Sequence, residues 1–163
     1  MLPPFATKHY QCYGTPPEAV APLIPYLKNK GIRTIWEPAA GDGLLASYLR
    51  NWGFNVIATD LSQGIDFLKT NLTILYDAVV TNPPFNLRTE FLRRSYHLGK
   101  PFCLLMPLLV NIEIASLANL YGVELLILSR RVRFIKDKKR MDTSPFNVAW
   151  FCRGILPKQL IIA

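Results

Sequence analysis

Apolar segments with the length of buried strands alternate with helix-like segments along nearly the whole of this 163-residue chain. The expected strands recur at intervals of roughly 20 to 25 residues, and segments with the 3.6-residue apolar period of a helix lie between them. These strands cover residues 32–36, 55–59, 77–81, 102–106, 123–128 and 146–152. Such alternation is typical of an α/β fold whose parallel strands are joined by right-handed helical crossovers. We therefore expect a doubly wound, mostly parallel sheet with helices on both faces.

Helices are expected over residues 16–29, 44–52, 88–98 and 112–121. Thr15 and Glu18 have the spacing of a capping box at the start of the first helix, and Pro22 and Pro25 predict a kink within it. No helix is expected between residues 123 and 152, so the last two strands should form a hairpin and the final strand should be antiparallel. No domain boundary is evident, which predicts one domain over residues 1–163 that ends in a short apolar tail.

The charge of the chain limits the kinds of partner that it can have. Nineteen Lys and Arg residues against eleven Asp and Glu residues give a net charge of +8 and a pI of about 9.6, which favours a polyanionic partner such as nucleic acid. The positive charge is concentrated between residues 130 and 140, where Asp137 is the single acid. We expect these cations to contact phosphates, although a solvated loop would have the same composition. They are Arg130, Arg131, Arg133, Lys136, Lys138, Lys139 and Arg140.

Other features of the sequence predict a cytoplasmic protein without a membrane partner. No segment has the length and apolarity of a membrane span, and the amino terminus lacks the basic and apolar regions of a secretory signal. The three cysteines, Cys12, Cys103 and Cys152, are far apart in the sequence and show no C-x-x-C spacing. We therefore expect neither a disulfide nor a zinc site.

The segment from Thr81 to Phe85, which reads Thr-Asn-Pro-Pro-Phe, follows an expected strand at the edge of the sheet where α/β proteins place their chemistry. Its two prolines remove two N–H donors and stiffen the loop, so the loop presents hydrogen-bond acceptors in one direction. The Asn82 amide oxygen and the Pro83 carbonyl can each accept one hydrogen of an exocyclic amino group, while Phe85 offers a flat face for stacking. An ordinary rigid turn is the alternative interpretation.

Two earlier strands end in acids beside segments suited to ligand binding. Glu37 ends the first strand, and the turn 38–43 consists mostly of small residues that permit a ligand to approach the backbone before a helix begins. Asp60 ends the second strand, where it can accept hydrogen bonds from ribose hydroxyls. Asp66 can accept from an adenine amino group while Phe67 packs on the ring. A turn former at Asp60 and a short core segment at 66–68 are the alternatives.

With these motifs in this order, the chain resembles the class I S-adenosylmethionine-dependent methyltransferases, and more closely those that methylate the N6 amino group of adenine in DNA or RNA. The matching segments are Thr15-Pro16-Pro17-Glu18, Glu37-Pro38-Ala39-Ala40-Gly41-Asp42-Gly43, Asp60, Asp66-Phe67-Leu68 and Asn82-Pro83-Pro84-Phe85. The resemblance implies a Rossmann-like, seven-stranded sheet, S-adenosylmethionine as the cofactor and no metal. We expect transfer to adenine N6 in nucleic acid, with DNA favoured over RNA.

The resemblance also implies a role for each matching residue. The catalytic motif, which would bind the target base and its amino group, is Asn82, Pro83, Pro84 and Phe85. The cofactor would contact Thr15, Glu37, Pro38, Ala39, Gly41, Gly43, Asp60, Asp66, Phe67 and Asn82. Within this set, Thr15 and the glycine turn would hold the methionine part, with Glu37 below it. Asp60 would bind the ribose hydroxyls, and Asp66 with Phe67 would bracket the adenine.

Two departures from the family pattern concern the substrate. Larger DNA-modifying relatives have a separate target-recognition region, whereas here only residues 86–89 and 130–145 are placed to read a sequence. Specificity should therefore be low, or come from a partner protein or a second copy of the chain. Ser144-Pro145-Phe146 could border the base pocket, although it equally fits the entry to the last strand. Phe85 stands where many relatives have tyrosine, which preserves stacking but loses a hydroxyl contact.

Other functions fit parts of the pattern. Related enzymes with Asn-Pro-Pro-Tyr methylate a glutamine side chain of a protein, and an amino group of ribosomal or transfer RNA is a further acceptor. A non-catalytic, nucleic-acid-binding subunit of a methyltransferase complex would not need both the Asn82 motif and the glycine turn. A nicotinamide-dependent oxidoreductase fits least, because the turn lacks the third glycine of that fingerprint and no second domain is expected.

Overall fold

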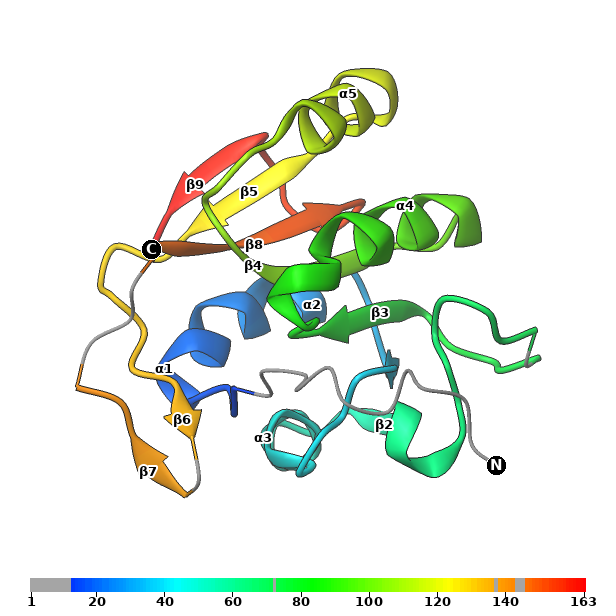
Figure 1. Ribbon diagram of the computed structural model, residues 1–163, viewed down its shortest axis with the longest axis vertical. Helices are drawn as coiled ribbons and strands as arrows, with labels where there is room; N and C mark the ends of the chain where they lie inside the picture. The colour runs from blue at the N-terminus through cyan, green and yellow to red at the C-terminus, as the bar shows by residue number, and fades with distance from the viewer. Residues whose placement is uncertain (1–12, 72, 137, 143–145) are drawn as a thin grey trace, which may run out of the picture.

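The computed structural model describes residues 13–71, 73–136, 138–142 and 146–163. In this part of the chain, one seven-stranded sheet has the order β2-β1-β3-β4-β8-β5-β9 (Figure 1). Its strands are β1 Thr34–Glu37, β2 Asn55–Ala58, β3 Ala78–Thr81, β4 Phe102–Pro107, β5 Glu124–Ile127, β8 Val148–Arg153 and β9 Leu160–Ile162. Strands β2, β1, β3 and β4 run parallel, and β8 is antiparallel to its neighbours β4 and β5. The expected Rossmann-like, mostly parallel sheet with one antiparallel strand is confirmed.

Strand β9 lies in the segment that the sequence predicts to be a short tail. The Leu125 amide donates to the Gln159 carbonyl at 2.8 Å, and the Ala163 amide donates to the Ile127 carbonyl at 2.9 Å. These bonds satisfy the outer edge of β5 and align β9 parallel to it. The tail is therefore part of the sheet, because an open strand edge with unpaired donors and acceptors is adjacent to it.

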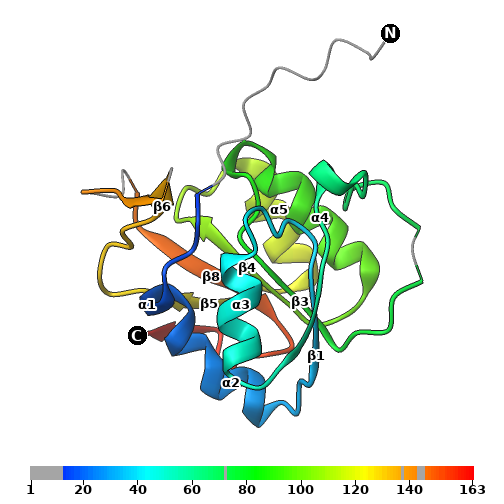
Figure 2. The ribbon, with the colours of Figure 1, turned by 90° about the horizontal axis from the view of Figure 1, so that it is seen from below.

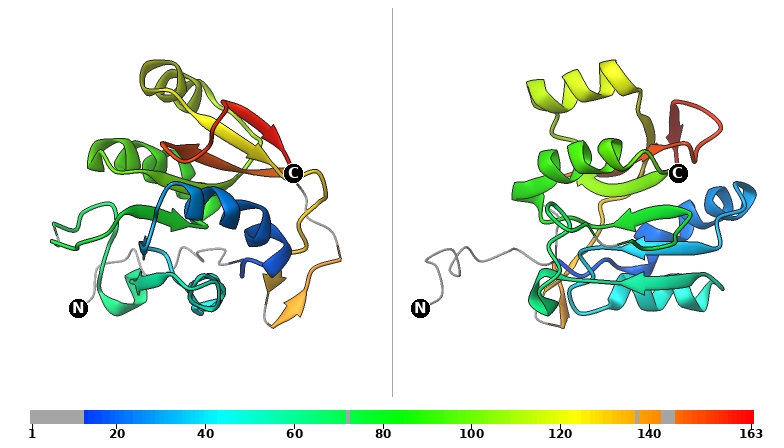
Figure 3. Two further views of the ribbon diagram at one scale, coloured as in Figure 1. Left: turned by 180° about the vertical axis from the view of Figure 1, so that it is seen from behind. Right: turned by 90° about the vertical axis from the view of Figure 1, so that its right-hand side faces the viewer.

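Alternating side chains of the strands form two core layers, one on each face of the sheet. Helices α1 Pro17–Val20, α2 Ile24–Asn29 and α3 Leu44–Asn51 cover one face, and α4 Arg88–Leu98 and α5 Ile112–Tyr121 cover the other. Ile35 and Val80 belong to the first layer, whereas Trp36 and Val79 belong to the second. Figures 2 and 3 show the two groups of helices on opposite sides of the strands. The expected placement of helices on both faces follows from this period-two pattern.

The first helix has the predicted kink but not the predicted cap. The 3₁₀ turn Ala21–Leu23 separates α1 from α2, as Pro22 and Pro25 led us to expect. The capping box is wrong, because Pro16 is the N-cap residue and, within the described residues, no side chain caps it. The Thr15 hydroxyl instead accepts a hydrogen bond from the Asn82 side chain at 3.1 Å. That contact joins residues far apart in the sequence, so local spacing could not reveal it.

The basic segment between residues 130 and 140 contains a hairpin, which the sequence predicts only as a loop. Strands β6 Ile135–Lys136 and β7 Lys139–Arg140 pair antiparallel, and Ile135 forms an isolated bridge with Gly14. Val132 and Phe134 are buried, whereas the seven cations are exposed. The apolar residues therefore seat the segment on the core and leave its charges facing solvent. We call residues 130–136 and 138–140 the basic hairpin.

Two cysteines that are distant in the sequence are neighbours in the sheet. Cys103 on β4 lies opposite Cys152 on β8, and both are buried and free in the chain as described. Burial, together with the adjacent Cys103 thiol, raises the pKa of Cys152. Cys12 lies outside the described residues. None of the described helices has both the length and the apolar character needed to cross a membrane.

Candidate active site

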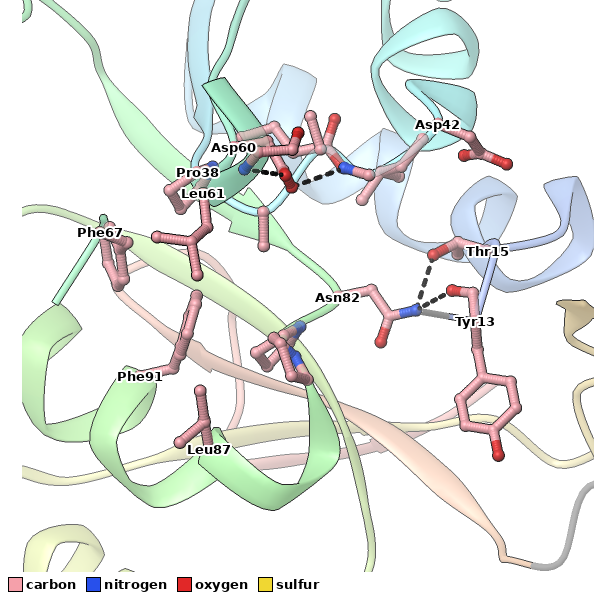
Figure 4. A pocket seen from close by; sticks show the side chains of 18 of the residues that line it. Tyr13, Thr15, Pro38, Asp42, Asp60, Leu61, Phe67, Asn82, Leu87 and Phe91 are labelled. Carbon is pink, nitrogen blue, oxygen red and sulfur yellow. Dashed lines mark hydrogen bonds between the residues drawn. The ribbon is translucent and has the colours of Figure 1, made fainter. Parts of the chain in front are cut away.

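A cavity of about 860 Å³ opens at the carboxyl ends of β1, β2 and β3 (Figure 4). This is the edge of a doubly wound sheet where ligands bind, and the volume is in the usual range for a ligand pocket. The walls come from residues 13–15, 37–42, 60–62, 65–69 and 82–85, from Leu45, Leu87 and Phe91, and from Ile135 and Lys138 of the basic hairpin. Segments that are far apart in the sequence therefore meet at one site.

The cavity contains most of the residues that the sequence analysis selected. Those that line it are Thr15, Glu37, Pro38, Ala39, Gly41, Asp60, Asp66, Phe67, Asn82, Pro83, Pro84 and Phe85. Gly43 does not line it in the described structure; instead it is the N-cap residue of α3. Leu61, Leu87 and Phe91, which the sequence analysis did not assign to a site, form part of the apolar wall. The periodicity of 88–98 predicts an inward face for Phe91 but cannot show that this face borders a cavity.

The glycine turn leaves space in front of its backbone. Gly41 and Gly43 have φ angles of +53° and +81°, a conformation that other residues adopt only with strain. A Cβ placed on either glycine would have no described atom within 4 Å. The Ala40 amide donates to the Thr59 carbonyl at 3.0 Å, which ties the turn to the end of β2. The turn is thus fixed in position and leaves room for a ligand to approach.

The Asp60 carboxylate organises the two loops beside the cavity. One of its oxygens accepts from the Gly41 amide and the other from the Ser62 amide, both at 2.9 Å. Its partial burial opposes ionisation, but the hydrogen bonds from Ser62 and Gly41 outweigh this effect and lower its pKa. Asp60 is therefore ionised near neutral pH and keeps lone pairs that further donors can use.

The expected adenine-binding pair is held in place by its own surroundings. One Asp66 oxygen accepts from the Leu68 amide at 3.0 Å, and the other lies 3.4 Å from the Lys69 ammonium group. Phe67 is buried and packs on Trp36 and Phe91, with ring centroids 5.2 Å and 4.8 Å away. Phe67 is thus a core residue that also borders the cavity, and its contact with an adenine ring stays a prediction.

Glu37 is a buried carboxyl group with an unused oxygen. It is 2% exposed, and its Oε2 atom has no hydrogen-bond partner among the described residues. Burial raises its pKa to about 8, helped by the negative charges of Asp42 and Asp60 and opposed by Arg50. A buried acid with an unpaired oxygen costs stability, and a strongly shifted pKa beside a cavity favours a functional position.

The Asn82 amide is oriented by two acceptors. Its Nδ2 donates to the Tyr13 carbonyl at 2.8 Å and to the Thr15 hydroxyl at 3.1 Å. Exchanging the amide oxygen and nitrogen would place two oxygens against each other at the Tyr13 carbonyl, so this assignment is chemically required. Figure 4 shows the amide oxygen pointing away from both partners. That oxygen is buried and has no hydrogen-bond partner within the described chain.

Phe85 belongs to an aromatic group at the same end of the cavity. Its ring lies 5.8 Å from Tyr13, 5.7 Å from Phe134 and 6.2 Å from Phe146, measured between centroids. Phe85 is partly exposed, so its ring is not wholly covered by these contacts. Of the segment expected to border a base pocket, Ser144 and Pro145 lie outside the described residues, whereas Phe146 meets Phe85 at an interplanar angle of 77°.

The cations of the basic hairpin differ in their surroundings. Within the described residues, Lys138 is the one that lines it. Arg140 forms an ion pair with Glu18 at 3.1 Å, so part of its charge is already neutralised. The remaining cations of the basic hairpin are exposed and are not among the residues that line the cavity. Among the described His, Cys, Asp and Glu side chains, no group of three or more could hold a metal ion.

The Rossmann-like fold described above is similar to that of a solved structure named as a methyltransferase. A Pyrococcus horikoshii protein, provisionally assigned as an RNA methyltransferase, matches with a TM-score of 0.64 at 18% identity, over 88% of this chain and 86% of that chain. This likeness establishes the fold. No protein-family model matches the sequence, and no curated protein matches it.

Two further structures match with TM-scores too low to support an argument. The 23S rRNA methyltransferase ErmE has a TM-score of 0.48 at 12% identity, over 85% of this chain and 69% of that chain. A release-factor-specific protein glutamine methyltransferase from Alicyclobacillus acidocaldarius has a TM-score of 0.45 at 24% identity, over 85% of this chain and 93% of that chain.

Proposed function

We propose that this protein is an S-adenosylmethionine-dependent methyltransferase that transfers a methyl group to the N6 amino group of adenine in nucleic acid. The observation that supports this function most directly is the Asn82 amide. Its nitrogen is fixed by two acceptors, which leaves its buried oxygen as an unpaired acceptor beside the cavity. An acceptor held in this way suits an amino group, which has two hydrogens to donate.

The residues present fit S-adenosylmethionine. The open space before Gly41 and the ionised Asp60 carboxylate suit a nucleoside with ribose hydroxyls, and the unpaired Glu37 oxygen suits the positive charge of the methionine part. Asp66 and Phe67 would hold the adenine, with Leu61 and Phe91 completing the apolar wall. When bound, this cofactor supplies an electrophilic methyl group on a sulfonium centre.

The chain's own residues would position the acceptor. Asn82 Oδ1 and the Pro83 carbonyl would accept the two amino hydrogens, which directs the nitrogen lone pair toward the methyl group, while Phe85 stacks on the base. As the nitrogen gains the methyl group it becomes cationic, and the two acceptors stabilise it until a proton is lost to solvent. No covalent bond to the protein forms in this scheme.

The basic hairpin favours nucleic acid as the source of that adenine. Its exposed cations lie on a segment that reaches the cavity at Lys138 and packs on Phe85 through Phe134. Phosphate contacts there would offset the few kcal/mol, roughly, needed to unstack a base. DNA follows from the resemblance in the sequence, and RNA from the provisional assignment of the Pyrococcus protein. Both nucleic acids are therefore included in the test.

The test is transfer of labelled methyl from S-adenosylmethionine to unmethylated duplex DNA, single-stranded DNA, structured RNA and bulk protein, followed by nucleoside or amino-acid analysis. Label recovered as N6-methyladenine supports the proposal and identifies the nucleic acid. Label recovered as N-methylguanine or N-methylglutamine would show that the acceptor is guanine or glutamine, and not adenine. Cofactor binding without transfer to any of the four would contradict the proposal and favour a non-catalytic subunit.

Asp60→Ala should weaken cofactor binding about tenfold or more, because each hydrogen bond between a charged group and a ligand contributes on the order of 1.5–3 kcal/mol. Isothermal titration with S-adenosylmethionine measures this loss. Asp77→Ala is a matched control, since Asp77 also accepts two backbone N–H groups, at 2.8 Å each, but does not line the cavity. If both variants lose the same affinity, Asp60 has only a structural role.

Replacing Lys136, Lys138 and Lys139 together by glutamine should weaken nucleic-acid binding and flatten its salt dependence. Each lost phosphate contact should reduce the slope of log affinity against log salt by about 0.7–0.9. A triple variant at Lys28, Lys30 and Lys158 removes the same charge from exposed sites outside the cavity lining and should retain the slope. Equal slopes for the two variants would exclude the basic hairpin from the interface.

A further inference from the structure

The consecutive residues Tyr13, Gly14 and Thr15 connect the candidate catalytic amide to the basic hairpin. Tyr13 and Thr15 provide the two acceptors that hold Asn82 Nδ2, at 2.8 Å and 3.1 Å. Between them, the Gly14 amide donates to the Ile135 carbonyl at 2.7 Å, and the Ile135 amide donates to the Gly14 carbonyl at 2.9 Å. Asn82 is therefore held by the two residues that flank Gly14, the residue paired with Ile135 of β6.

The bridge to Ile135 requires a residue without a side chain at position 14, because there is little space around Gly14. A Cβ on Gly14 would lie 3.2 Å from Ile135 Cβ, 3.3 Å from the Ile135 carbonyl oxygen and 3.3 Å from Leu44 Cδ2. Two of these neighbours are the backbone oxygen and Cβ of β6 itself, which cannot rotate away. Any larger residue must therefore move the bridge by a few tenths of an ångström, and the flanking Tyr13 and Thr15 acceptors would move with it.

The basic hairpin depends on contacts outside itself. Strands of two residues each are too short to be stable alone. The hairpin is supported by the Gly14 bridge, by the buried Phe134, which packs on both Tyr13 and Phe85, and by the ion pair between Arg140 and Glu18. A polyanion bound to its cations would stabilise the seated position, and this stabilisation would extend through the bridge to Asn82.

We infer that Gly14 is a positioning residue whose backbone bridge to Ile135 links phosphate binding on the basic hairpin to the orientation of the Asn82 amide. This inference rests on the proposed function of Asn82. The basic hairpin would then do more than bind the substrate. Phosphates bound to it would help to fix the Asn82 amide oxygen, which aligns the target amino group.

The test compares wild type with Gly14→Ala. A misplacement of well under 1 Å at Asn82 should lower kcat by about tenfold or more. The KM for nucleic acid should stay within about twofold, because this variant retains every cation. The dissociation constant for S-adenosylmethionine should change less than kcat, because Thr15 is the one expected cofactor contact that flanks Gly14 and the contacts at Gly41 and Asp60 are retained. Glu18→Gln is the control: it removes the Arg140 ion pair, leaves the bridge intact, and should keep kcat within about twofold.

A second measurement does not depend on turnover. The ¹⁵N-labelled side-chain amide of Asn82, assigned by its loss in Asn82→Asp, is followed by NMR while an oligouridine of twelve nucleotides is added. This probe provides phosphates but no adenine. The Asn82 signal should shift in wild type and in Glu18→Gln, and should shift less in Gly14→Ala although the oligonucleotide binds.

The results distinguish failure of the proposed function from failure of the link between the basic hairpin and Asn82. A wild-type response that is lost in Gly14→Ala supports the link even if no methyl transfer is found, in which case only the proposed function fails. An unchanged kcat and an unchanged response in Gly14→Ala overturn the inference and leave the function standing. It is also overturned if Asn82 does not respond to the oligouridine in wild type, or if Glu18→Gln loses as much kcat as Gly14→Ala.

Discussion

Asn82→Ala should lower methyl transfer by about a thousandfold, with the affinity for S-adenosylmethionine changed no more than about threefold. The substitution removes the oriented amide oxygen, which we propose to accept from the target amino group, and the alignment of reacting atoms provides much of the rate of such a transfer. Single-turnover transfer from labelled cofactor measures the first quantity, and isothermal titration measures the second. A large loss of cofactor affinity would count against the proposed role of Asn82.

Two further variants separate this role from a loss of structure. Asn82→Asp keeps an oxygen acceptor but places a carboxylate oxygen against the Tyr13 carbonyl, which accepts from Asn82 in the wild-type protein at 2.8 Å. We expect transfer to fall in this variant too. Asn111→Ala is the matched control, because the Asn111 amide also donates to a threonine hydroxyl, but its oxygen caps α5 and it lies outside the cavity lining. It should cost roughly 1 kcal/mol of stability and leave transfer intact.

Glu37→Gln should stabilise the fold while it weakens cofactor binding. The pKa of Glu37 is raised from 4.5 to about 8 in the folded protein by burial. Between these values the folded carboxyl group keeps its proton and the unfolded one loses it, so stability falls as the pH rises from about 4.5 to about 8. Glutamine does not titrate, and the variant should be more stable than wild type by about 3 kcal/mol at pH 7.

Thermal unfolding of both proteins at several pH values tests this prediction. At or below pH 4.5, where Glu37 is protonated in both states, the two proteins should have similar stability, which provides an internal control. By pH 8 the difference in stability should reach about 4 kcal/mol, which corresponds to a gap in Tm of roughly 8–16 °C. A difference in stability that does not change with pH would contradict the raised pKa.

The affinity for the cofactor should depend on pH with the opposite sign to that of the stability. A bound positive charge favours the ionised form of Glu37, so binding near pH 7 should release a proton and the wild-type affinity should rise with pH up to about 8. Affinity in Glu37→Gln should be lower and nearly independent of pH over the same range. A group that lowers stability and raises affinity is explained by function rather than by folding.

The sequence by itself determined the order and type of most elements of the sheet and its helices. Period-two apolar runs and helical periodicity are local properties, and the strand that ends at Thr81 and the helix Arg88–Leu98 depend on little else. The predicted strands end at or just before Glu37, Asp60 and Asn82, and parallel strands place their following loops at one edge. The cavity contains all three.

Only the tertiary structure decided features that depend on contacts between distant residues. Thr15 has the local spacing of a helix cap, yet the N-cap residue is Pro16 and the Thr15 hydroxyl accepts from Asn82, which follows a distant strand. The tail became β9 because β5 presented an open edge, and the basic segment became a hairpin because Gly14 and buried apolar residues hold it. The raised pKa of Glu37 likewise arises from burial. Hydrogen-bond pairing and desolvation are properties of the assembled fold, whereas periodicity is a property of the chain.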